Sequence, residues 1–286
     1  MVQQLPGGYV FDPADPRSPS EDQWAEMTPA QRARVVSMLP AEVPWELMPP
    51  EGDAHRAAKE RATGTLDDFY RRVGRRIYIS SELSVFYPNE PRFSPDVLAV
   101  LDVDPHQRNK WVVVDEGKGL DLVIEVHAAG DRAKDYKTNV ERYARLGITE
   151  YFIFDVSALD LRGHRLAPAE GKKPRAYRPV LPQRGRWAST VLGLDLAIDG
   201  GKIRFFHGNA PLLEAAELAD NLGKMLDEVL AHKQEAEERA RTAEELVRAA
   251  EERAEIEAKR SADLERQLRE VQAEIARLKG GGGSTS

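Results

Sequence analysis

Short apolar runs alternate with polar and helix-like stretches along the first part of the chain. Residues 98–100 and 122–126 are dense in branched apolar side chains, and 150–156 forms a third run of this kind. Runs of this length and composition are typical of buried strands. Residues 131–146 have helical spacing and end at Gly147, so the pattern predicts two parallel strands joined through a helix.

Two more helices are predicted on the N-terminal side. Ser20 can cap a helix that continues to Leu39, and Thr28-Pro29 restarts it with a second cap. The next helix covers 53–73. The other expected elements are strands at 76–87, 92–103 and 190–206 and hairpin-like pieces at 161–166 and 176–181. Helices interspersed with short strands predict an α/β fold.

A different pattern begins after residue 210. Apolar or alanine positions repeat there with alternating spacings of four and three from Leu212 to Leu278. This spacing predicts a coiled coil, with a middle weakened by alanines and by Lys233, Glu257 and Ser261, and we expect a homodimer whose orientation stays open. A single helix carrying charge pairs is the alternative. The expected divisions are an N-terminal arm at 1–50, an α/β domain at 51–210, the coiled coil at 211–279 and a flexible linker or cloning scar at 280–286.

Charge is unevenly distributed along the chain. The net charge is −7, yet residues 51–210 hold 26 basic and 23 acidic side chains while both flanks are acidic. The middle of the chain thus permits DNA binding without requiring it. The chain has no cysteine, no signal-like start and no apolar run near the ~20 residues that span a bilayer. We therefore expect a cytoplasmic protein with no membrane partner.

Two predicted strands each carry a carboxylate where an apolar residue is expected. Asp96 belongs to the strand at 92–103, and Glu125 lies in the run 122–126. A buried carboxylate is costly unless something pairs with it. Two of them on neighbouring strands suggest a divalent cation, Mg²⁺ or Mn²⁺, with Asp96 and Glu125 as its ligands.

The ordered set "SPDVLAV", "DLVIEV" and "DRAKDYKTNVERYARLGITEYFIFD" resembles the Uma-type restriction endonuclease family of the PD-(D/E)xK nuclease superfamily. The resemblance covers roughly residues 50 to 195. It implies a restriction-endonuclease-like mixed sheet flanked by helices, to which the chain adds a long C-terminal coiled-coil helix. It also implies a magnesium-dependent DNA endonuclease that hydrolyses phosphodiesters.

The chain departs from the family pattern at the lysine. The superfamily lysine stands two residues after the strand acid, where this chain has His127. In the Uma-type family it stands instead on the following helix, between an Asp and a Tyr, and that slot is Asn139. A helical wheel places Lys137 at the edge of the inner face and Lys134 on the far side. We therefore expect Lys137 as the substitute, with His127 as a further candidate base or ligand.

Basic residues with interleaved aromatics follow the predicted core. Lys172, Lys173, Arg175 and Arg178 are candidates for contacts with a phosphate backbone, and a solvated loop is the alternative.

Three functions compete for the whole chain. Intact Asp96 and Glu125 favour an active nuclease. Asn139 in the lysine slot favours a catalytically impaired nuclease fold that binds DNA or protein. The long tail favours an interaction protein, or a dimer built on the nuclease.

Overall fold

A computed structural model of the protein describes residues 3–4, 8–42, 52–128, 132–168, 171 and 174–280. The chain divides into two compact units, Met1–Glu217 and Leu218–Ser286. The first unit holds the sheets, and the described part of the second belongs to one long helix. Within the described ranges, each helix is too short or too polar to cross a lipid bilayer.

The first unit is built around a six-stranded sheet with the strand order β10-β9-β8-β7-β5-β3. Its strands are β3 (Ile77–Ser80), β5 (Val97–Leu101), β7 (Leu122–His127), β8 (Glu150–Asp155), β9 (Asp160–Leu166) and β10 (Tyr177–Val180). In this sheet β7 and β8 are parallel, and the other neighbouring pairs are antiparallel. The mixed α/β sheet and the parallel crossover predicted from the apolar runs are therefore confirmed.

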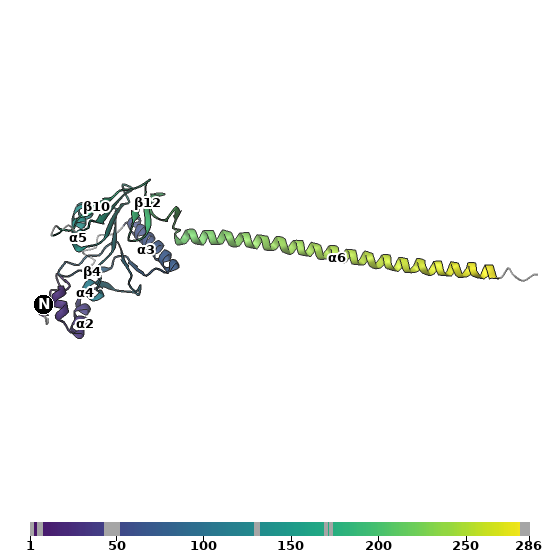
Figure 1. The fold of residues 1–286 in the computed structure, drawn as a ribbon, viewed down its shortest axis with the longest axis horizontal. Helices are drawn as coiled ribbons and strands as arrows, with labels where there is room; N and C mark the ends of the chain where they lie inside the picture. Colours follow the sequence, from purple (N-terminus) through teal and green to yellow (C-terminus); the bar gives the residue numbers. More distant parts are fainter. Residues whose placement is uncertain are drawn as a thin grey trace, which may run out of the picture. The chain divides into compact units, whose positions relative to one another are not determined.

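Helices cover both faces of this sheet, and β7 and β8 are therefore buried along their whole length. Helix α3 (Asp53–Val73) packs Leu66 into the cluster that holds Ile124. Helix α5 (Asn139–Leu146) packs Tyr143 into the cluster on the opposite face. Figure 1 shows the sheet between these two helices.

The single strand expected at 76–87 is wrong, because the chain forms two separate strands there. The backbone of Glu82 has φ 54°, in the left-handed region, and its N–H donates to the Pro95 carbonyl just before β5. This turn ends β3 and directs β4 (Ser84–Phe86) into a two-stranded parallel sheet with β6 (Lys110–Val112). The short helix α4 (Val113–Glu116) follows β6.

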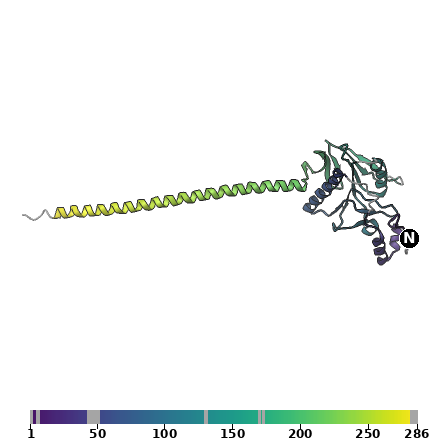
Figure 2. The same ribbon diagram turned by 180° about the vertical axis from the view of Figure 1, so that it is seen from behind.

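The N-terminal arm is part of the first unit and packs against β4. Its elements are β1 (Gln3–Gln4), β2 (Val10–Phe11), α1 (Glu21–Glu26) and α2 (Pro29–Met38). Ser20 and Thr28 form the two caps predicted for these helices, each as a reciprocal capping box. Trp24 and Val35 pack in one apolar cluster with Phe86 of β4. Figure 1 shows α2 beside α4, whose Val114 packs against the same cluster, and Figure 2 shows the first unit from behind.

A second, four-stranded antiparallel sheet closes the first unit. Its strands are β11 (Trp187–Ser189), β12 (Leu194–Asp199), β13 (Lys202–His207) and β14 (Ala210–Pro211). Glu150, the first residue of β8, joins the two sheets. Its fully buried carboxylate accepts hydrogen bonds from the Thr190 backbone N–H at 2.9 Å and from the Ser189 hydroxyl, and it pairs with Arg165 at 2.8 Å.

Helix α6 (Ala215–Gly280) matches the predicted C-terminal helix. Leu212, which the repeat assigned to the helical seam, instead packs in the core of the first unit at 7% exposure. Arg204 of β13 pairs with Glu217 in the first turn of the helix at 2.6 Å. The seam of α6 therefore begins beyond these residues.

Replacing Glu150 should destabilise the first unit. We expect Glu150→Ala to lower the free energy of unfolding by about 3 kcal/mol, because Arg165 and the donors at 189–191 lose their shared buried acceptor. Urea unfolding followed by tryptophan fluorescence measures this, because all four tryptophans lie before residue 188. The exposed Glu141→Ala is the matched control, and equal midpoints for the two variants would contradict this role of Glu150.

Candidate active site

The pairing of β5 with β7 brings Asp96 and Glu125 together. Asp96 immediately precedes β5, and Glu125 is the fourth residue of β7. Val97 pairs with Ile124 in this antiparallel register, so the two acids are opposite each other. The Asp96 backbone N–H donates to Glu125 Oε2 at 3.3 Å. Strand alternation points the Glu125 carboxylate to the face that α5 covers, where Tyr143 contacts it.

Asp96 is held by donors from two elements. The Val126 N–H donates to Asp96 Oδ2 at 2.7 Å, and His55 Nε2 of α3 lies 3.1 Å from the same oxygen. Burial alone would raise the pKa of Asp96, but the hydrogen bond and charge of His55, the Val126 N–H and the charge of Lys59 lower it below its ordinary value. Asp96 is therefore an anion at neutral pH.

Glu125 lies in the opposite electrostatic situation. It is 5% exposed, and its Oε1 accepts a hydrogen bond from the Tyr143 hydroxyl at 2.7 Å. Burial, followed by the charge of Asp96, raises the pKa of Glu125 well above its ordinary value, although the Tyr143 hydrogen bond opposes part of the rise. Two adjacent carboxylates with opposite shifts form a site that gains from a positive charge.

His127 is fixed by a buried chain of polar contacts. Its Nδ1 lies 3.0 Å from Asp135 Oδ2, and Asn139 Nδ2 donates to Asp135 Oδ1 at 3.2 Å. Tyr151 donates to the Asp135 backbone carbonyl at 3.0 Å. A carboxylate accepts hydrogen bonds, so Nδ1 carries the hydrogen, and a neutral His127 ring has Nε2 as its basic nitrogen.

A wide helical turn, η3 (Lys134–Thr138), places Asp135 on the inner face. This turn has the π-helical spacing, which shifts the residues before α5 relative to a regular helix. Asp135 is buried, whereas Lys134 and Lys137 are exposed. The charge of Lys134 lowers the pKa of Glu125, against the larger effects of burial and Asp96. The wheel, which favoured Lys137, assumed an uninterrupted α-helix, and both lysines are exposed, so the choice of Lys137 as the substitute stays a prediction.

Of the four cations expected to contact DNA, the two described ones, Arg175 and Arg178, lie away from this site. Lys172 and Lys173 lie outside the described residues. Arg175 lies against the glycine that ends α5, away from the beginning of that helix. Arg178 on β10 is level with the first residue of β8, whereas Glu125 is level with the fourth and three strands away. DNA contact by these residues stays a prediction for a separate surface.

Several contributors have no motif that identifies them in the sequence. His55 and Lys59 lie one turn apart on α3, and Lys59 also pairs with Glu82 in the turn after β3. This spacing is the one local signal that they share a helix face. Glu60, a possible site acid on α3, is 68% exposed and pairs with Arg56, which fits a solvated helix face.

The acids fit a hard divalent cation by their chemistry. Among the described residues, the hydrogen bonds to the Asp96 carboxylate end on Oδ2, so Oδ1 is its oxygen without one. The same part of the chain holds no group of three or more His, Asp or Glu arranged to bind a metal. Magnesium commonly takes one or two protein carboxylates and completes its shell with water and phosphate, so two acids suffice.

An acid pair on adjacent strands of a mixed sheet, with a tyrosine-bearing helix above it, belongs to the nuclease class that the sequence resembles. The sequence matches the profile of the Uma2 family, described as "Putative restriction endonuclease", over residues 37–199. This is more than half of the chain, and the chain belongs to this family. Family membership supports a nuclease activity.

This chain also shows a similarity to a solved structure. It is described as a "putative nuclease belonging to DUF820" from Anabaena variabilis ATCC 29413. The similarity covers 47% of this chain and 74% of that chain, with 12% sequence identity and a TM-score of 0.35. The comparison with curated proteins found no match.

Removing the charge of Glu125 should stabilise the metal-free protein. A carboxyl whose folded pKa is raised destabilises the fold when ionised, and this penalty disappears as the pH falls through the folded pKa. We expect Glu125→Gln to unfold with a free energy on the order of 1 kcal/mol higher than the parent at neutral pH. The gap should narrow toward pH 5.

Urea unfolding in chelator at several pH values measures this difference. Glu141→Gln on the exposed side of α5 is the control and should leave stability unchanged at each pH. A destabilised Glu125→Gln at neutral pH would show that the ionised carboxylate is held by more favourable contacts than Tyr143 and the Asp96 N–H.

Proposed function

We propose that this chain is a metal-dependent DNA endonuclease of the restriction type that hydrolyses phosphodiester bonds. The observation that carries the proposal is the Asp96–Glu125 pair, a half-buried and a buried acid that face each other and have opposite pKa shifts. His127 lies two residues after Glu125 on the same strand face, about 7 Å along β7. Glu125 and His127 thus share one side of the sheet.

Asp96 and Glu125 would hold Mg²⁺ or Mn²⁺. When bound, the ion supplies Lewis acidity at the phosphate and acidifies an attacking water. The protein contributes to this by keeping Asp96 ionised through His55 and by orienting Glu125 through the Tyr143 hydroxyl. It also excludes bulk water from Glu125, because β7 and α5 bury that side chain.

His127 is our candidate for the general base that accepts the proton of the attacking water. Asp135 orients the ring through Nδ1. Lys137, expected from the helical wheel, and Lys134, whose charge lowers the pKa of Glu125, are our candidates for the cation that offsets charge at the phosphate. His127 and one of these lysines would thus share the role of the family lysine.

A second candidate function is a DNA- or protein-binding module that has lost catalysis. The observation in its favour is Asn139, which stands in the family lysine slot and directs its amide to Asp135. An amide cannot replace the charge of a lysine. The same nuclease assay separates the two candidates.

Magnesium or manganese should support cleavage of supercoiled plasmid by the full chain and not by Glu125→Ala. Calorimetry should show binding of the divalent ion to the parent, and Asp96→Asn should weaken that binding by about 10-fold or more, because it removes a charged oxygen ligand. The exposed Asp104→Asn is the matched control. Ion binding without cleavage would favour the binding module, and equal binding by Asp96→Asn would exclude Asp96 as a ligand.

Disrupting the histidine should affect turnover more than substrate binding. We expect His127→Ala to lower kcat by about 10²-fold with little change in KM, the range typical of general-base removal. Asp135→Asn keeps the shape but loses the charge, so its kcat should fall between those of the parent and His127→Ala. Single-turnover plasmid cleavage measures both, with Glu141→Gln as the control. Unchanged rates in both variants would leave Lys134 and Lys137 as the candidates.

A further inference from the structure

The long helix α6 exposes an unusual amount of apolar surface. Of the seventeen large apolar side chains that are exposed among the described residues, thirteen lie on α6. Leu222 is 64% exposed, and Leu268 is 59% exposed. Scattered exposed leucines need no explanation, but a continuous row along one helix marks a binding surface.

Nine of these thirteen side chains lie on one seam, the set of positions that alternate in spacing between four and three. Most of the nine occur near the two ends of the helix, and Val247 stands among the alanines between them. The others are Leu222, Leu226 and Val229 at the first end and Leu264, Leu268, Val271, Ile275 and Leu278 at the second. Such a seam fits another helix with the same repeat.

We infer that α6 pairs with α6 of a second copy of this chain as a parallel, in-register, two-stranded coiled coil. The partner is identified by charge complementarity beside the seam. In a parallel pair, the residue just before seam positions such as Leu226, Ala240 and Ser261 faces the partner residue five places further along the sequence. Arg239 then faces Glu244, and Arg260 faces Glu265, each twice because of the two-fold symmetry. Met225 faces Leu230 in the same way.

An antiparallel pair is the strongest competitor. One antiparallel frame places Lys233 opposite Glu257 and preserves contacts between the leucine ends. The same frame sets Glu237 against Glu251 and Arg239 against Arg253, and like charges at these distances repel. The residues beside the seam therefore attract in the parallel arrangement and repel in the antiparallel one.

The charged residues within the seam do not reverse this preference. The Lys233 ammonium lies 3.6 Å from Glu237 on its own helix, and its side chain is 69% exposed. A long lysine stem lets that charge leave the seam for solvent. Glu257 has Arg253 and Arg260 one turn away on either side. Lys233 and Glu257 thus each have an opposite charge nearby on their own helix, whichever way the partner helix runs.

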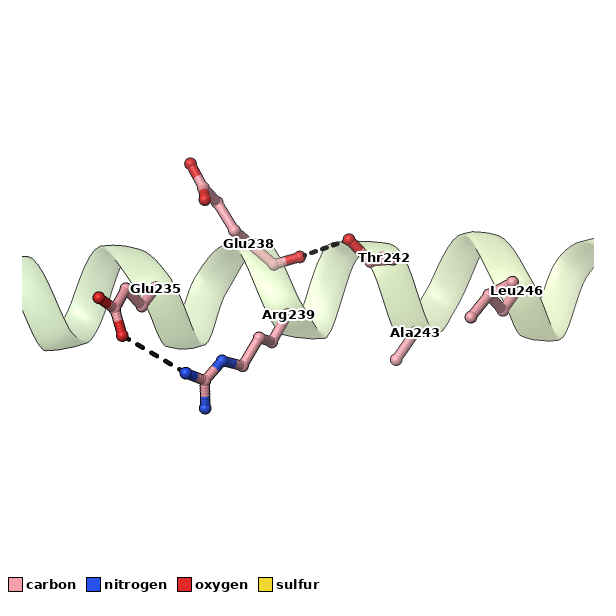
Figure 3. A pocket seen from close by; sticks show the side chains of 6 residues that line it. All are labelled: Glu235, Glu238, Arg239, Thr242, Ala243 and Leu246. Atoms are coloured by element: carbon pink, nitrogen blue, oxygen red, sulfur yellow. Dashed lines mark hydrogen bonds and ion pairs between the residues drawn. The ribbon is translucent and has the colours of Figure 1, made fainter.

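Figure 3 shows the weakest part of the seam, around Ala243. Six side chains line a shallow depression there: Glu235, Glu238, Arg239, Thr242, Ala243 and Leu246. Arg239 already pairs with Glu235 of its own helix at 3.4 Å. The small Ala243 leaves room for a partner helix to approach closely, beside the apolar stem of Arg239.

Parallel pairing has a consequence that follows from connectivity. Each Met1–Glu217 unit continues into the beginning of its α6, so both units belong to the same end of the coiled coil. Pairing itself does not depend on the nuclease activity. Only its use, two sites for the two strands of one duplex, rests on the proposed function.

Single cysteines test the orientation cleanly, because the chain has none of its own. Ala236→Cys and Ala254→Cys lie at seam positions, and Glu245→Cys lies on the outer side as the control. In a glutathione redox buffer, parallel pairing predicts that each seam variant alone forms a disulfide-linked dimer in most of the protein, whereas Glu245→Cys stays unlinked. Seam variants that cross-link only when mixed with each other would establish the antiparallel frame and overturn the inference.

Sedimentation of the full chain tests the pairing independently. The parent should sediment at tens of micromolar with twice its 32.0 kDa mass. Val271→Asp on the seam should be mostly monomeric, whereas Ala273→Asp on the outer side should remain a dimer. A monomeric parent, a higher oligomer or a fully dimeric Val271→Asp would overturn the inference. Neither assay uses cleavage, so their outcome is separate from that of the nuclease test.

Discussion

Burial of the Glu125 carboxylate against Asp96 is the constraint on which the rest of the site depends. A strand covered on both faces leaves no water for a carboxylate in its middle, so protein groups must replace solvent. Tyr143 and the Asp96 N–H replace part of it, and the charge of Asp96 opposes the ionisation of Glu125. A fold that keeps such a pair sacrifices stability at one position, which is typical of sites arranged for function.

The helix over the sheet is arranged around the same constraint. Its wide turn brings Asp135 inward, where the carboxylate orients His127 and accepts from Asn139. Asn139 stands in the family lysine slot, and His127 stands two residues after Glu125. Both differ from the family pattern, and both contact the Asp135 carboxylate. This linkage explains physically how a polar Asn139 is accommodated at 5% exposure, since its amide has a charged acceptor.

The two units are stabilised in different ways. The first unit closes its sheets around apolar clusters and around Glu150, whose buried carboxylate collects donors from the segment that leads into the second sheet. Helix α6 lacks such a core among the described residues, because its side chains from Ala219 to Leu278 are exposed. An isolated helix of this kind relies on intrahelical pairs such as Lys259 with Glu255, each of them weak, so its apolar seam favours association.

The sequence by itself determined the elements whose signals are local. Apolar runs defined β7 and β8, the caps at Ser20 and Thr28 defined two helices, and Gly74 and Gly147 ended two more with positive φ. The acid pair Asp96 and Glu125 could also be read from the chain, because a carboxylate inside an apolar run is conspicuous without knowledge of the fold.

Only the tertiary structure decided which polar side chains reach these acids. His55 and Lys59 come from a helix about forty residues before Asp96, and an ordinary helix pattern carries no record of that contact. The inward position of Asp135 depends on a π-turn that the periodicity of a regular helix does not contain. Glu82 divided the expected long strand through one left-handed residue. In each case the deciding interaction joins distant segments or alters helical phase, whereas sequence patterns report local burial.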